Sequence, residues 1–246
     1  NCVAQISTVG ECKIYLEDFM PYDLMLEESN DFDKRIKNAM SFYSWCASRM
    51  IPPDRTYAKE ILNSIGASQS VTDRERAQIA LSYHCLSLLD VFWVKEENEK
   101  IRFEDINLFA HSLSNALVDI ALRGHQMTVT NAHLLANDLS TGGLYPKAWV
   151  RKEDGFYLYK DGGRDAVERE VLASKICRCF DCHQVLYEQG MFENEPVSIS
   201  KIMTSQRYSL VTYAAYDVYC TNRDWNTLDK ILELDAPGYY MMNILD

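Results

Sequence analysis

Two short stretches of the chain combine residue types that can bind phosphate. The first is the run Ser-Thr-Gly-Gly at residues 140–143, where glycines let main-chain N–H groups approach a phosphate and hydroxyls add donors. The second is Lys160, which ends the apolar run 155–160 and precedes Asp-Gly-Gly. A lysine there can hold the α- and β-phosphates of a nucleotide. Each stretch also has an ordinary interpretation, the first as a linker and the second as a solvated lysine beside a hairpin turn.

The helical segment that follows contains Glu168 and Glu170. If this helix packs beside the strand that carries Lys160, one of the two carboxylates can pair with the ammonium and hold it in place. Protein kinases position the phosphates of ATP with such a lysine–glutamate pair. The alternative is that both glutamates only stabilise the first turns of the helix through its macrodipole. The order of turn, strand lysine and helix glutamate is more specific than any one of its parts.

Two kinds of hydrophobic pattern describe the elements that must position these residues. Helical periodicity comes first, with Asp31 or Asp33 as a helix cap and a capping box that starts at Thr72. The expected helices are residues 31–50, 55–65, 72–89, 103–109, 113–122, 164–179 and 224–246, the last with a break at Pro237-Gly238. The expected strands are residues 12–17, 91–94, 148–152, 155–160, 184–188 and 197–203.

We therefore expect an α+β protein with a helical N-terminal domain. Its parts are a strand and loop segment (residues 1–30), a helical domain (31–136), an antiparallel sheet with one main helix (137–205) and further helices (206–246). The sequence shows no internal repeat and no low-complexity segment.

Composition and charge exclude several classes of function. The formal net charge is −11 and no basic run is present, which argues against binding to nucleic acid. No window of about 18 apolar residues occurs, so we expect no membrane span. The first ten residues lack the pattern of a signal peptide. We therefore expect the eight cysteines to be reduced thiols and the protein to be cytoplasmic.

Four motifs carry a resemblance to a known family. Phe-Tyr-Ser-Trp-Cys-Ala-Ser-Arg-Met-Ile-Pro-Pro-Asp-Arg at 42–55 is similar to a tryptophan–arginine–Ile-Pro signature, and Leu-Leu-Asp-Val-Phe-Trp-Val at 88–94, with 103–109 after it, to a second signature. Residues 157–163, Tyr-Leu-Tyr-Lys-Asp-Gly-Gly, and 170–176, Glu-Val-Leu-Ala-Ser-Lys-Ile, resemble an ATP-lysine strand and its partner helix. On these motifs the chain resembles the HipA-like kinases, in particular an uncharacterised bacterial branch with a helical N-terminal domain.

The resemblance implies an ATP-dependent kinase that phosphorylates a protein or other hydroxyl acceptor and uses ATP and Mg²⁺. It implies a kinase-like N-lobe at residues 137–205, followed at 206–246 by the hinge and the start of a helical C-lobe. Lys160 would contact the α/β-phosphates, Glu170 would orient it, and the hinge backbone would meet adenine. The nucleotide-binding residues carried over in this way are Ser140, Thr141, Gly142, Gly143, Lys160, Glu170 and Met203, with Thr204 beside the last.

The sequence departs from the family in one respect. A catalytic loop of the Asn-Thr-Asp-Arg-His type, with a later metal-binding aspartate, does not occur, and residues 240–246 look like the helix that leads into it. We therefore expect no catalytic residue and no magnesium ligand in this chain, and no phosphate transfer by the chain alone. The alternative function is a non-catalytic module on a kinase-like scaffold, whose helical domain binds a partner protein.

A second pattern with possible chemistry is C-x-C-x-x-C-H, formed by Cys177, Cys179, Cys182 and His183. These are four potential zinc ligands within seven positions. Structural zinc sites usually draw their ligands from two separated pairs, and adjacent ligands strain a tetrahedral shell. We therefore favour core packing for Cys177 at the end of its helix and keep zinc as the alternative.

Overall fold

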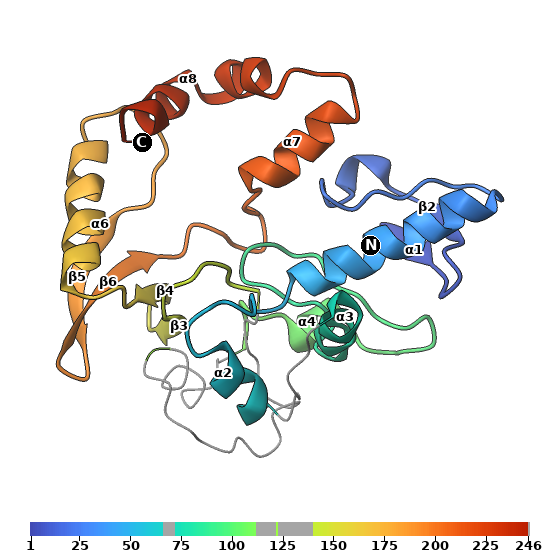
Figure 1. Cartoon of the computed structure of the whole chain (residues 1–246), viewed down its shortest axis with the longest axis horizontal. Coiled ribbons are helices and arrows are strands. Elements are labelled where there is room, and N and C mark those ends of the chain that lie inside the picture. Colours follow the sequence, from blue (N-terminus) through green and yellow to red (C-terminus); the bar gives the residue numbers. More distant parts are fainter. Residues whose placement is uncertain (66–71, 112–121, 123–139, 246) are drawn as a thin grey trace.

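The fold of the computed structural model is α+β, as the sequence predicts, and the structure describes residues 1–65, 72–111, 122 and 140–245. Among these residues, helices α1 to α4 precede a four-stranded antiparallel sheet and helix α6, and helices α7 and α8 follow (Figure 1). A two-stranded sheet lies near the N-terminus. Almost all of the helix predicted at residues 113–122 falls outside the described residues.

The N-terminal segment begins with an antiparallel hairpin of β1 (Ala4–Ile6) and β2 (Cys12–Ile14), followed by the 3-10 turn η1 (Glu17–Phe19). Of the two strands, the alternation in the sequence predicts only the second. Helix α1 (Phe32–Ser48) begins where the sequence predicts, because the side chain of Asp31 accepts a hydrogen bond from a main-chain N–H of the first turn.

Asn38 fastens the hairpin to α1. Its buried side-chain amide donates hydrogen bonds to the carbonyl oxygens of Gly10 (3.1 Å) and Glu27 (2.8 Å). Gly10 has a φ of +79°, and a Cβ at this position would lie 1.8 Å from the main-chain oxygen of Arg35. Glycine is therefore required where the hairpin approaches the helix.

Three shorter helices follow: α2 (Ala58–Ser64), α3 (Asp73–Ser82) and α4 (Phe103–Ile106). The capping box predicted at the start of α3 is present. The hydroxyl of Thr72 accepts a hydrogen bond from the main-chain N–H of Glu75, and the Glu75 carboxylate accepts one from the N–H of Thr72. Helix α4 covers only the first four residues of the helix predicted there.

Two predictions for the segment between α3 and α4 are wrong. The helix predicted to continue to residue 89 ends at Ser82, because His84 and Cys85 adopt left-handed φ values of 56° and 53°. The strand predicted at residues 91–94 does not form. Instead, Val94 donates its main-chain N–H to the carbonyl of His84 and closes a loop.

Arg49 at the end of α1 joins residues 42–55 to residues 88–94. Its Nη1 and Nη2 donate hydrogen bonds of 2.8 and 2.7 Å to the two carboxylate oxygens of Asp90. The guanidinium also lies over the ring of Trp45, 4.7 Å from the centroid. Both charged side chains are largely buried, at 8% and 14% exposed. This two-point, charge-assisted contact fixes the loop after α3 against α1.

The main sheet contains β3 (Lys147–Lys152), β4 (Gly155–Lys160), β5 (Tyr187–Phe192) and β6 (Glu195–Lys201) in the order β3-β4-β6-β5. All neighbouring strands are antiparallel. Helix α6 (Arg164–Cys177) connects β4 to β5 and packs on β5 and β6 (Figure 1). The sequence predicts β3, β4 and α6 closely, whereas β5 begins three residues later and β6 two residues earlier than predicted.

Both faces of the sheet pack against segments that precede it. Successive side chains of a strand point to opposite faces. One face contributes Ala148 to a hydrophobic core that includes Trp45. The opposite face contributes Trp149 and Phe156 to a second core with Leu88. The sheet and the N-terminal segments therefore share their hydrophobic cores.

Helices α7 (Tyr213–Thr221) and α8 (Thr227–Leu245) end the chain. The rings of Tyr22 and Tyr219 stack at 4.2 Å between centroids, which places α7 on the N-terminal segment. Helix α8 has a kink at Asp235, two residues before Pro237, in agreement with the predicted break. None of the described helices combines the length and apolar character that a bilayer-crossing helix needs.

Candidate functional site

Lys160 and Glu170 are in direct contact between β4 and α6. The Nζ atom of Lys160 lies 2.9 Å from Oε1 of Glu170 and donates a second hydrogen bond, also 2.9 Å, to the hydroxyl of Tyr187 on β5. The ammonium lies 4.5 Å from the centroid of the same tyrosine ring. The other oxygen of Glu170 accepts a hydrogen bond from Ser198 on β6. We call these four residues the lysine–glutamate cluster.

Helical periodicity directs Glu170 toward the sheet. Val167, Glu170, Ser174 and Cys177 recur at steps of three and four residues, which places them on one side of α6. These four side chains are buried or half-buried, whereas Glu168 is exposed. Of the two glutamates considered from the sequence, the structure therefore selects Glu170 as the partner of the strand lysine.

Burial and hydrogen bonding act in opposite directions on the pKa of Lys160. Burial has the largest influence and lowers the pKa, because the charged form loses hydration. The hydrogen bonds with Tyr187 and Glu170 raise the pKa, and the result lies above the usual value for lysine. The ammonium is therefore fully charged at neutral pH.

The two hydroxyls of the Ser-Thr-Gly-Gly turn point into the protein. The Oγ atom of Ser140 lies 2.6 Å from Oγ of Ser87, and the hydroxyl of Thr141 accepts a 2.8 Å hydrogen bond from Nε1 of Trp149. Ser140 and Thr141 are 9% and 8% exposed. These side chains therefore hold the turn in place, while residues 142 and 143 are exposed.

Arg55 anchors both sides of this turn. Its buried guanidinium donates hydrogen bonds to the main-chain carbonyls of Thr141, at 3.1 Å, and Lys147. The main-chain N–H of Thr56 adds a 2.9 Å hydrogen bond to the carbonyl of Leu144. The segment just before α2 thus fixes the position of the turn relative to the sheet.

Lys147 belongs to this site, although the sequence analysis does not single it out. It pairs directly with Lys160 across β3 and β4, so both side chains project from the same face of the sheet. Its ammonium folds back over the turn and donates a 2.5 Å hydrogen bond to the carbonyl of Gly142. Gly143 has a φ of +97°, and a Cβ there would lie 2.3 Å from Nζ of Lys147. Glycine is therefore needed at this position.

The charges around Lys147 favour an anion. Burial has the largest effect on the pKa of Lys147, followed by Arg55 and Lys160; all three lower the pKa, Glu170 raises it, and the resulting value is about 8. Two cations and one carboxylate therefore act on the ammonium of Lys147. The local excess of positive charge contrasts with a net charge of −11 for the chain. A multiply charged anion such as a polyphosphate fits this arrangement.

Met203 lies away from the lysine–glutamate cluster. It follows the end of β6 and is 52% exposed. Ser198, which pairs with Lys160, is five residues earlier, so extended chain of this length separates the two positions by about 16 Å. The adjacent Thr204 is buried and donates a hydrogen bond to the carbonyl of Leu88. The structure thus brings the turn, Lys160 and Glu170 together and leaves Met203 at the far end of β6.

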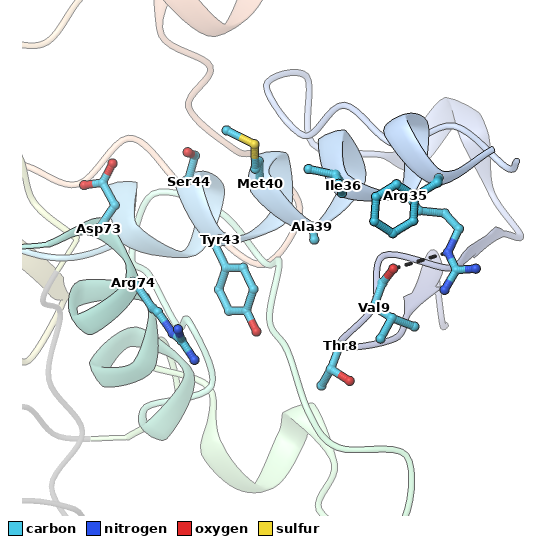
Figure 2. Close-up of a pocket in the computed structure, with 11 residues that line it drawn as sticks. Thr8, Val9, Arg35, Ile36, Ala39, Met40, Tyr43, Ser44, Asp73 and Arg74 are labelled. Carbon is cyan, nitrogen blue, oxygen red and sulfur yellow. Dashed lines mark hydrogen bonds between the residues drawn. The ribbon is translucent and has the colours of Figure 1, made fainter. Parts of the chain in front are cut away.

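A groove of about 540 Å³ runs along α1, separate from the lysine–glutamate cluster (Figure 2). Phe32, Ile36 and Met40 recur every four residues along one side of this helix and are 71%, 43% and 65% exposed. Figure 2 shows Arg35 and Arg74 toward opposite ends of the groove. An apolar stripe of this kind is typical of a surface that binds another protein.

The structure does not bring together the potential zinc ligands Cys177, Cys179, Cys182 and His183. Across the part of the chain that the structure describes, no three His, Cys, Asp or Glu side chains converge on a position where they could hold a metal ion. Cys177 is buried at the end of α6, and Sγ of Cys182 lies 3.6 Å from the sulfur of Met241. All eight cysteines of the chain are free thiols.

Comparisons of the chain with protein-family models, with curated proteins and with solved structures each find no match. The resemblance to HipA-like kinases therefore rests on the sequence motifs alone. The function of the protein has to be argued from the geometry of the site.

Proposed function

We propose that this chain is the nucleotide-binding portion of a HipA-like ATP-dependent kinase, which when intact phosphorylates a protein or other hydroxyl acceptor. The observation that carries the proposal is the 2.9 Å contact between Lys160 and Glu170. This contact joins a strand of the antiparallel sheet to the helix that packs on it, as the phosphate-positioning lysine–glutamate pair of protein kinases does. In this proposal residues 137–205 are the kinase-like N-lobe and residues 206–246 the hinge and the start of the C-lobe.

Each residue of the site has a defined role in the proposal. Lys160 contacts the α- and β-phosphates of ATP, and Glu170 holds its ammonium in position. The exposed main chain of Gly142 and Gly143 approaches the phosphates, since neither residue has a side chain to block them. Adenine meets the main chain near Met203. The cations Arg55 and Lys160, which both act on Lys147, support the binding of an anion at this place.

Catalysis needs residues that this sequence does not contain. The base-like aspartate and the later metal-binding aspartate of the family's catalytic loop do not occur. When Mg²⁺ accompanies ATP, we expect its ligands to be phosphate oxygens and residues outside this chain. The chain alone should therefore bind ATP without transferring phosphate. Magnesium-dependent ATP turnover that Lys160→Ala abolishes would contradict this part of the proposal.

Nucleotide binding by the 246-residue chain tests the proposal. Mg-ATP at a hundred times its Kd should stabilise the chain by about 2.7 kcal/mol in thermal unfolding. Lys160→Ala and Glu170→Gln should weaken binding measured by isothermal titration calorimetry. Glu168→Gln, an exposed change on the same helix, should bind as wild type does. If Lys160→Ala binds Mg-ATP as tightly as wild type, the proposed site is wrong.

The groove along α1 favours a second function, a non-catalytic interaction module. In that case the helical domain (residues 31–136) binds a partner protein and the sheet serves as a scaffold. The supporting observation is the exposed stripe of Phe32, Ile36 and Met40 on α1. Apolar residues at this spacing on one side of a helix are typical of helices that pack against a partner protein. A pure scaffold gains no stability from Mg-ATP, so the thermal measurement above separates the two functions.

A further inference from the structure

Lys147 and Lys160 are like charges directly opposite each other on adjacent strands, an arrangement that opposes folding. Glu170 bonds directly to Lys160. The hydrogen bond of Lys147 goes instead to a neutral acceptor, the carbonyl of Gly142. Local conflicts of this kind occur in folded proteins chiefly where the groups serve a functional site.

Both lysines keep hydrogen-bonding capacity for a ligand. An ammonium group has three N–H donors. Among the described residues, Lys160 uses two donors, on Glu170 and Tyr187, and Lys147 uses one, on Gly142. The remaining donors belong to side chains on the same face of the sheet, beside an exposed turn. One anion with several oxygens can therefore bind both ammonium groups.

We propose that Lys147 is a second phosphate-binding lysine of this site, and that ligand binding moves its ammonium from the Gly142 carbonyl to a phosphate oxygen. The inference rests on the proposed nucleotide site and adds the class of ligand. We expect a diphosphate or triphosphate, which offers oxygens on more than one phosphorus atom, to bind both lysines. The ammonium lies where a Cβ of residue 143 would be, so glycine lets it fold over the turn, and beside Gly142 a Cβ would meet no atom within 4 Å, which leaves space for a ligand.

Ligand binding then changes the protonation of Lys147. Burial, Arg55 and Lys160 lower the pKa of this lysine against the opposing effect of Glu170, and the value is about 8. At pH 8 about half of the free protein therefore carries a neutral Lys147. A bound polyphosphate raises the pKa because it adds negative charge nearby. Lys147 itself should take up roughly half a proton per ligand at pH 8 and almost none at pH 6.5.

Isothermal titration calorimetry in two buffers of different ionisation enthalpy measures this proton uptake. The ligands are ATP and inorganic tripolyphosphate, each added to the full 246-residue chain at pH 6.5 and pH 8. Wild type should show uptake at pH 8 with both ligands. Lys147→Met should lose the uptake and bind roughly tenfold more weakly or worse, since a charge-assisted hydrogen bond is lost. Lys152→Met, an exposed change on the same strand, should match wild type in both respects.

Amine acetylation of the wild-type chain provides a measurement that needs no variant. Bound ATP should slow the acetylation of Lys147 at pH 8, where about half of this amine is neutral, and leave that of Lys152 unchanged, as read by peptide mass mapping. Equal affinity and equal proton uptake in Lys147→Met and wild type overturn the inference, as does acetylation of Lys147 that ATP leaves unchanged. If either of these results is found and Lys160→Ala still loses ATP binding, the proposed nucleotide site is supported and only the role of Lys147 is wrong. A wild-type chain that binds neither ligand overturns both proposals.

Discussion

The guanidinium of Arg49 holds the carboxylate of Asp90 through two hydrogen bonds, at 2.8 and 2.7 Å. The two residues are 41 positions apart, and each lies in one of the two stretches that resemble family signatures. A buried ion pair thus connects the two stretches and fixes the loop after α3 against the end of α1.

Breaking this ion pair should strongly destabilise the fold. Asp90→Ala leaves the Arg49 charge buried opposite an apolar side chain, and we expect a loss of about 3–5 kcal/mol in the free energy of unfolding, measured with urea. The control is Lys34→Ala, which removes an exposed ion pair with Glu27. It should leave the urea midpoint almost unchanged, because exposed pairs contribute little. Similar effects of the two substitutions would count against the buried pair.

The two glycines of the turn should differ in their tolerance of alanine. Gly143→Ala places a Cβ on a residue with φ +97° and within 2.3 Å of the Lys147 ammonium. We expect it to lower the free energy of unfolding by about 1–2 kcal/mol. At Gly142 a Cβ meets no atom within 4 Å and φ is not in the left-handed region, so Gly142→Ala should be nearly neutral. Equal urea midpoints for the two variants would contradict the described turn.

The lowered pKa of Lys147 predicts a pH dependence of stability. Burial first, then Arg55 and Lys160, lower this pKa from 10.5 to about 8 in the folded chain. Between these two values the unfolded chain binds more protons than the folded chain, so the free energy of unfolding rises with pH. Relative to Lys147→Met, wild type should therefore gain stability between pH 8 and pH 10 and show no change below pH 7. Urea unfolding of both proteins at each pH measures the difference, and a difference independent of pH contradicts it.

The cysteines should react in the order of their exposure. The pKa of the Cys46 thiol is raised, first by a hydrogen bond with Cys85 and second by burial, and the thiolate is the reactive form. Cys2 and Cys179 are exposed. A disulfide reagent added to the native chain should modify these two rapidly, whereas Cys46, Cys85 and Cys220 should react only after unfolding. Peptide mass mapping reads the sites, and rapid labelling of Cys46 in the native chain would refute the order.

Elements with local signals could be predicted from the sequence. Helix α1 begins at its Asp31 cap, and the hairpin of β3 and β4 has a two-residue turn at residues 153–154. The loop at residues 83–94 was predicted wrongly because distant contacts determine it. Arg49 hydrogen-bonds the carbonyls of Cys85 and Phe92, and no periodicity in the sequence encodes such contacts.

In the candidate site, contacts between residues close in sequence could be predicted, whereas contacts between residues far apart in sequence could not. The pairing of Lys160 with Glu170 follows from a strand, a short connection and the face of one helix. Lys147 could also have been found, since the two-residue turn fixes the hairpin register that sets it opposite Lys160. The hydrogen bonds of Arg55 could not be predicted, because their acceptors lie 86 and 92 residues away in the sequence.

The long reach of Arg55 also has a consequence for the newly made chain. At about 5–20 residues per second, synthesis needs roughly 5–18 s to pass from Arg55 to Lys147. During this interval the carbonyl that Arg55 binds does not yet exist, and Trp149 has not arrived to cover Leu88. The early helices therefore leave the ribosome with apolar side chains that their later partners do not yet cover, and a chaperone can bind these side chains during this interval.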